Sequence, residues 1–225
     1  MEQTDNHGHR ERLRQRFCQV GIDGLHDYEM LELLLSFVIP QRDLKPLAKA
    51  LIRKFKTLGG VLSASIDELQ LVNGVGVRSA TLFKLVHDLA GVCLAEKIFD
   101  HDVLSSPGAV RDFCRMKIGG SKREAFMVIF LNPKNHVITY QVLQEGTIDH
   151  ATIYPREIVT AALRHLATGI IMVHNHPSGE CTPSRADLKI TESIVNAAAA
   201  IEVKVLDHLI VSRGNYLSFS EKSLI

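Results

Sequence analysis

The chain has 225 residues, and 46% of them are apolar, so it is long enough to bury the cores of two small domains. Its formal net charge of +1 argues against binding nucleic acid by bulk electrostatic attraction, although a local basic patch is compatible with that charge. The cysteines are scattered and form no Cys-x-x-Cys pair, which predicts reduced thiols in a cytoplasmic protein. The N-terminus is polar, and the longest apolar stretch (31–39) is too short to span a bilayer. We therefore expect no association with membranes.

The first hundred residues predict helices and no strands. Apolar side chains recur there at helical spacing, as in 27–38, which Pro40 ends. The predicted helices are 10–18, 27–38, 44–55, 67–71 and 77–94. We therefore expect residues 1–99 to form an all-helical domain.

The end of this region, 69–80, resembles a helix-hairpin-helix. Gly74 and Gly76 permit a tight turn with close backbone approach, and the next helix would present free N–H groups to a phosphate. Arg78 would add a charge-assisted contact. Such contacts position a protein on DNA without reading its sequence, so DNA is a candidate partner of this domain. The alternative is a helix connection that uses its glycines only to turn.

The pattern changes near residue 102, after a linker predicted at 97–104. The predicted strands are 124–130, 137–143, 169–173, 203–206, 209–212 and 216–219, and the predicted helices are 106–116, 155–167 and 183–200. A hairpin loop is expected at 132–135. We therefore expect residues 102–225 to form an α/β domain with a mixed sheet flanked by helices.

The strand 169–173 leads into the pattern His174-Asn175-His176, and Asp187 follows after ten further residues. Side chains two apart on a strand point to one face, so the two imidazoles lie together. Two imidazoles and one carboxylate suit one Zn²⁺ ion per chain with a fourth position open to water, as in catalytic zinc sites. The alternative is two polar histidines at a strand end and an aspartate that favours its helix N-terminus.

The turn after the histidines supports the metal interpretation. Thr182-Pro183 predicts a helix with Thr182 as N-cap and Pro183 at its first position. Ser184 and Asp187 then share one face of this helix. The Ser184 hydroxyl has two interpretations: it stabilises the oxyanion of a tetrahedral intermediate, or it only helps to cap the helix. Cys181 is either a fourth zinc ligand that closes the site or a plain loop cysteine.

Zinc lowers the pKa of water to roughly 7, and a nearby carboxylate can then carry its proton to a leaving amine. Three upstream glutamates are candidates. Glu124 stands at the edge of an apolar strand, Glu145 at a turn, and Glu157 in a first helical turn, where the helix dipole alone explains a carboxylate. We favour Glu124, because a strand edge can project its side chain into a site at the end of a sheet. Asp207-His208 is expected to be structural, with support of a ligand histidine as the alternative.

These residues together resemble a known signature. Glu124, the His174–His176 pair, Ser184 and Asp187 are similar to the JAMM (MPN+) metalloprotease motif. The longer strings 174–179 and 182–185 resemble the bacterial RadC subgroup, as do 155–158, Asp207-His208 and the helical N-terminal region. The chain departs from that subgroup at Cys181, where proline is usual, which leaves the ligands intact and leaves the rigidity and the redox sensitivity of the loop open.

The resemblance implies a site and a reaction. His174, His176 and Asp187 would hold zinc, Glu124 would be the general acid/base, and Ser184 would stabilise the oxyanion. It implies a JAMM/MPN-like, cytidine-deaminase-like fold and a hydrolase that cleaves peptide or isopeptide bonds of a protein or peptide substrate. RadC proteins are named for DNA repair, and that name establishes no reaction. The alternative is a DNA-binding or DNA-processing protein in which the metal domain is a scaffold.

Overall fold

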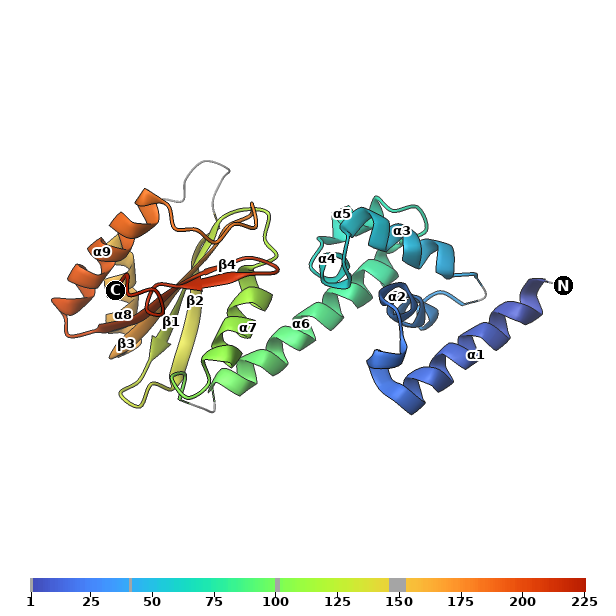
Figure 1. Cartoon of the computed structure of the whole chain (residues 1–225), viewed down its shortest axis with the longest axis horizontal. Helices are drawn as coiled ribbons and strands as arrows, with labels where there is room; N and C mark the ends of the chain where they lie inside the picture. The colour runs from blue at the N-terminus through green and yellow to red at the C-terminus, as the bar shows by residue number, and fades with distance from the viewer. Residues whose placement is uncertain (1, 41, 100–101, 146–152) are drawn as a thin grey trace. The chain divides into compact units, whose positions relative to one another are not determined.

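The structure is a computed structural model that describes residues 2–40, 42–99, 102–145 and 153–225 (Figure 1). The chain divides into two compact units, Met1–Ala90 and Gly91–Ile225. Helix α6 (Val77–Phe99) begins in the first unit and ends in the second, so the predicted linker overlaps the end of a helix. No helix in the described ranges combines the length and the apolarity needed to cross a membrane.

The first unit is built from helices, as predicted. Its elements are α1 (Glu2–Val20), the 3₁₀ helix η1 (Gly21–Gly24), α2 (Asp27–Ser36), α3 (Lys45–Phe55), α4 (Leu58–Leu62), α5 (Ile66–Gln70) and the start of α6. The apolar faces of α2 to α6 meet in one core, which includes Leu31, Leu51 and Phe83, whereas Leu13 of α1 packs in a separate cluster with Leu25 and Leu33. Helix α4 was not predicted, because it contains two glycines and glycine disfavours helices. Thr57 caps this helix by accepting a hydrogen bond from the amide of Gly60 (2.9 Å).

The second unit contains a five-stranded mixed sheet, which confirms the predicted α/β class. The strands are β1 (Ala125–Leu131), β2 (Val137–Glu145), β3 (Gly169–Asn175), β4 (Lys204–Val211) and β5 (Tyr216–Ser218), in the order β2-β1-β3-β4-β5. Only β3 and β4 pair in parallel; the other neighbours are antiparallel. The helices are α7 (Pro107–Ile118), α8 (Pro155–Arg164) and α9 (Arg185–Ala199).

Each face of this sheet is covered by helices (Figure 1). Met127, Ile129 and Val173 pack against α7 and the end of α6, whereas the alternate strand residues, such as Val128 and Met172, pack against α8 and α9. Both faces are therefore dry, which explains why β1 and β3 are continuous apolar runs and do not alternate with polar residues. Successive side chains of a strand point to opposite faces of the sheet, so each face receives every second residue.

Three predicted boundaries in this unit are wrong. The strands predicted at 203–206 and 209–212 are one strand, β4, because Asp207 and His208 keep their pairing with β3. Helix α9 begins at Arg185 and is capped by Ser184, two residues later than the predicted Thr182 cap. Helix α8 ends at Arg164, three residues before the predicted end at 167.

Candidate metal centre

The two histidines stand at the end of β3, on the sheet face that α8 and α9 cover. Ile170 and Met172 precede His174 at every second position and are fully buried against those helices. His174 is the next residue on the same face of the strand and is 8% exposed, so the apolar part of this face ends at Met172. His176 follows two residues later, where its amide donates to the carbonyl of Val211 (3.1 Å).

The donor atoms of the three predicted ligands converge. The Nε2 atoms of His174 and His176 are 3.0 Å apart. Asp187 Oδ1 lies 3.3 Å from Nε2 of His174, and its Oδ2 lies 3.5 Å from Nε2 of His176. In the part of the chain that the structure describes, these three side chains form a group that could share a metal ion, with ligand atoms within 4.8 Å of one another. Two nitrogens and one carboxylate form the donor set of a catalytic zinc site.

The other nitrogen of each imidazole is already engaged. Nδ1 of His176 donates to the carbonyl oxygen of Glu180 (2.7 Å), which keeps a proton on Nδ1, so that the deprotonated ring has its lone pair on Nε2. Nδ1 of His174 lies 2.8 Å from Nε2 of His208, on the neighbouring strand. Both rings therefore turn Nε2 toward Asp187, and Nε2 is the nitrogen that is left to bind a metal.

Electrostatics keep Asp187 ionised. Its burial by itself would raise its pKa, but hydrogen bonds from His174 and His176 outweigh burial and hold the pKa well below its usual range. In return, the hydrogen bond with Asp187 raises the pKa of His176, against the opposing effect of burial. Without a cation, the Nε2–H groups of the protonated imidazoles satisfy this carboxylate; in the deprotonated rings the Nε2 lone pairs face the position that a metal ion would take.

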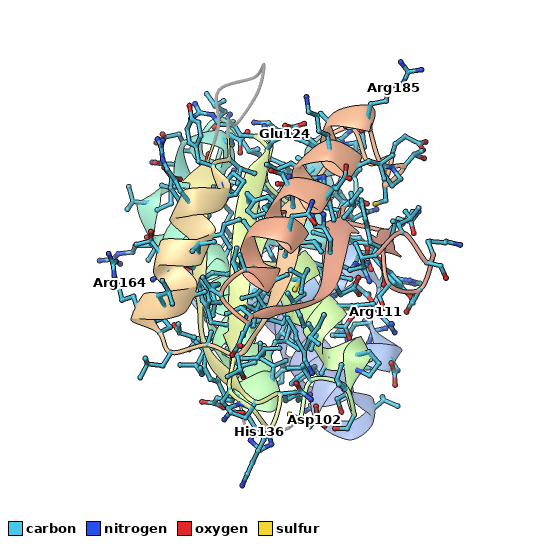
Figure 2. The ribbon with its side chains drawn as sticks, turned by 90° about the vertical axis from the view of Figure 1, so that its left-hand side faces the viewer. Asp102, Arg111, Glu124, His136, Arg164 and Arg185 are labelled. Atoms are coloured by element: carbon cyan, nitrogen blue, oxygen red, sulfur yellow. The ribbon has the colours of Figure 1, made fainter. Side chains whose placement is uncertain are left out.

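Glu124 lies immediately before β1, at the sheet end where the histidines stand. Phe126 pairs with His174, so continuing the antiparallel register by two residues places Glu124 opposite His176. The charge of Glu124 is among the causes that raise the pKa of His176. Figure 2 shows Glu124 at the same end of the domain as Arg185, the first residue of α9, and His136 at the opposite end. The Glu124 side chain is exposed and therefore open to a substrate.

The sequence analysis overlooked Asn175, the residue between the two histidines, which holds Glu124 in place. Its fully buried side chain accepts a hydrogen bond from the amide of Ala125 (2.7 Å) and donates to the carbonyls of Ser121 (3.3 Å) and Arg123 (3.1 Å). The residues on both sides of Glu124 are thus tied to the strand that carries the histidines. The sequence did contain a signal for this role: Asn175 alternates with the two histidines, so its polar side chain points to the opposite, apolar face of the sheet, where it needs hydrogen-bond partners.

Ser184 forms a reciprocal capping box with Asp187. Its hydroxyl accepts from the Asp187 amide (3.1 Å), and its own amide donates to Asp187 Oδ2 (2.7 Å). The capping interpretation of Ser184 is therefore part of the structure, and its hydroxyl hydrogen is still available for a substrate oxygen. The same box fixes the Asp187 carboxylate against the histidines.

Substitution of Ser184 separates these two roles. We expect Ser184→Ala to lower the unfolding free energy by about 1 kcal/mol, and Ser184→Gly by only a few tenths, because glycine is an acceptable N-cap. Urea denaturation measures both values. A hydroxyl that acts only as a cap predicts a smaller loss of activity in the glycine variant, whereas one that contacts the substrate predicts equal losses in both.

The other candidates take less direct positions. Cys181 is buried against Ile210 and Phe219 and is not in the convergent group, so it packs as a loop cysteine. Glu157 is exposed in the first turn of α8, as the dipole interpretation expects. The side chain of Glu145 lies outside the described residues.

The hairpin of the first unit adopts the geometry that its glycines permit. Gly74 has a φ of +97°, in the left-handed region that favours glycine, and Gly76 has open space around it. Arg78 is exposed in the first turn of α6. Arg42 lies against this turn: a Cβ atom added to Gly74 would be 3.0 Å from its guanidinium. A second cation that the sequence did not indicate therefore stands at the hairpin.

Comparisons with known proteins cover both units. Residues 104–224 match a family model described as RadC-like JAB domain, and residues 5–81 match one described as UPF0758 N-terminal. UPF0758 protein FN0909 of Fusobacterium nucleatum subsp. nucleatum is 39% identical over 232 residues, an alignment that covers 100% of both chains. The three convergent residues lie within the first match, and the glycine hairpin within the second.

Proposed function

The chain belongs to the RadC family, and we propose that it is a zinc-dependent hydrolase that cleaves peptide or isopeptide bonds in a protein or peptide substrate. The observation that carries the proposal is the convergence of His174, His176 and Asp187 at the end of β3, next to the start of β1, which Glu124 precedes. A three-ligand set with an adjacent carboxylate is suited to hydrolysis, because it combines an electrophile with a base.

The residues present fit a zinc ion. Both histidines offer Nε2 while their Nδ1 atoms are held by fixed partners, and Asp187 is anionic. When bound, zinc supplies a Lewis acid that activates water at neutral pH and polarises a carbonyl group. Cys181 packs away from the group, so three protein ligands leave a fourth position for the reaction. We infer one zinc ion per chain.

The chain's own residues supply proton transfer and orientation. Glu124 is placed to accept a proton from the attacking water and to deliver it to the leaving amine. Its exposure allows a substrate carbonyl to lie between it and the convergent group. The hydroxyl of Ser184 has a hydrogen free to donate to the oxygen of that carbonyl as negative charge develops.

Metal content tests the proposal first. We expect protein purified without added metal to contain about one zinc ion per chain by elemental analysis, and His176→Ala to have lost it. His136→Ala is the matched control, because His136 lies at the opposite end of the same domain (Figure 2) and should leave the zinc content unchanged. Wild-type protein that neither contains zinc nor binds it on titration would refute the metal site. Bound zinc without hydrolysis of any peptide or isopeptide in a broad screen would refute the peptidase.

The N-terminal unit carries a second proposal, binding of DNA through the glycine hairpin. The left-handed Gly74 and the adjacent guanidinium of Arg42 favour it, because a phosphate can be held by helix amides and a cation together. We expect Gly76→Glu/Arg78→Glu to weaken duplex binding and to reduce its salt dependence. Gly214→Glu/Arg164→Glu makes the same charge change in the other unit and should leave both unchanged. Equal binding by the two double variants would exclude the hairpin as the DNA site.

A further inference from the structure

His208 is a fully buried histidine in the middle of β4 that the proposed chemistry does not use. The rings of Phe126 and Phe219 pack against it, with centroids 5.8 and 4.7 Å from its own. Its nitrogens contact two polar partners: Nε2 lies 2.8 Å from Nδ1 of His174, and Nδ1 lies 2.7 Å from the hydroxyl of Thr191. A buried imidazole with a partner on each nitrogen holds one tautomer.

The direction of each hydrogen bond follows from Thr191. Its hydroxyl donates its single hydrogen to the carbonyl of Asp187 (2.5 Å), one helical turn earlier, so toward His208 it can only accept. Nδ1 of His208 therefore carries a proton and donates it. The described contacts of His208 are two phenylalanine rings, one hydroxyl and one imidazole, so a neutral ring with its proton on Nδ1 offers Nε2 as an acceptor. The proton between the two rings then belongs to Nδ1 of His174.

We propose that Thr191 and His208 are positioning residues that hold His174 as its Nδ1–H tautomer, with the Nε2 lone pair directed at the cation position. The relay starts at the Asp187 carbonyl and ends at His174, so it also ties the first turn of α9 to β3. This inference rests on the proposed metal site. Neither Thr191 nor His208 would bind the metal ion itself. Through His208, strand β4 would orient His174, a metal ligand carried by β3.

Thr191→Val and Thr191→Ser form the matched pair that tests the relay. Both replacements fit the helix, but only serine keeps the hydroxyl. In metal-free protein labelled with ¹⁵N, at a pH above the imidazole range, long-range NMR spectra report the tautomer of each ring. We expect Nδ1–H on both His174 and His208 in wild type and in Thr191→Ser, and a loss of that tautomer at His174 in Thr191→Val.

Zinc affinity, measured by competition with a chromophoric chelator, is the second readout. We expect Thr191→Val to bind zinc about 10- to 100-fold more weakly than wild type, and Thr191→Ser to bind it normally. His208→Gln, whose amide oxygen can replace the Nε2 acceptor, should retain more affinity than His208→Leu. An Nε2–H tautomer of His174 in wild type, or equal zinc affinity of the two Thr191 variants, would overturn the relay. Failure of wild type to bind zinc at all would instead refute the metal site, with the NMR assignment still deciding the relay.

Discussion

Glu124→Gln is expected to reduce hydrolysis by about two to four orders of magnitude while zinc remains bound, since the amide keeps the shape of the carboxylate but accepts no proton. The measurement is kcat on a peptide or isopeptide substrate identified by screening, with zinc content determined on the same preparation. The position of Glu124 should survive the substitution, because Asn175 holds the backbone on both sides of it.

Glu157→Gln is the matched control for this experiment. Glu157 is also an exposed glutamate of the second unit, but it stands in the first turn of α8, where it serves the helix dipole. We expect its substitution to leave kcat unchanged. Full activity of Glu124→Gln would remove Glu124 from the chemistry, and a loss of zinc in that variant would mean that it acts as a ligand.

Zinc is expected to stabilise the folded protein strongly. At a free concentration 1,000 times its dissociation constant, zinc should raise the unfolding free energy by about 4.1 kcal/mol, because the unfolded chain does not present the three ligands together. Urea denaturation with and without zinc measures this increment. Asp187→Asn is the informative variant: its side-chain oxygen can still accept from the Ser184 amide, yet it lacks the anionic ligand, so the increment should largely disappear.

This zinc increment should grow as the pH rises. In metal-free protein the pKa of His176 is raised by Asp187, so their pairing stabilises fully below the unfolded value of about 6.5 and is lost as pH rises through the folded pKa. Zinc binds the deprotonated imidazole. At low pH it must therefore displace the proton of His176, whereas at high pH that proton is already lost. The difference between zinc-loaded and metal-free unfolding free energies is therefore smallest below about pH 6.5 and largest above the raised pKa. An increment that falls with rising pH would contradict His176 as a ligand.

The sequence by itself determined most of the elements and the identity of the convergent residues. Runs of apolar residues at helical spacing marked the first unit, and the run before His174 marked β3 as a buried strand, because periodicity is a local property of the chain. The spacing His174-x-His176 with Asp187 beyond a turn was also local, since one strand, one loop and one helix carry all three. These residues could be predicted because few long-range contacts are needed to bring them together.

Only the tertiary structure decided how the ligands are held. Asp207 and His208 were predicted to interrupt a strand because polar residues are rare in buried strands. Their backbones pair with β3, and the hydroxyls of Ser218 and Thr191 satisfy the side chains of Asp207 and His208. The register between β1 and β3 likewise brought Glu124 to the sheet end where His176 stands, although the two residues are 52 positions apart in the sequence. Pairing of strands and the direction of buried hydrogen bonds depend on partners distant in the chain, and no local pattern records them.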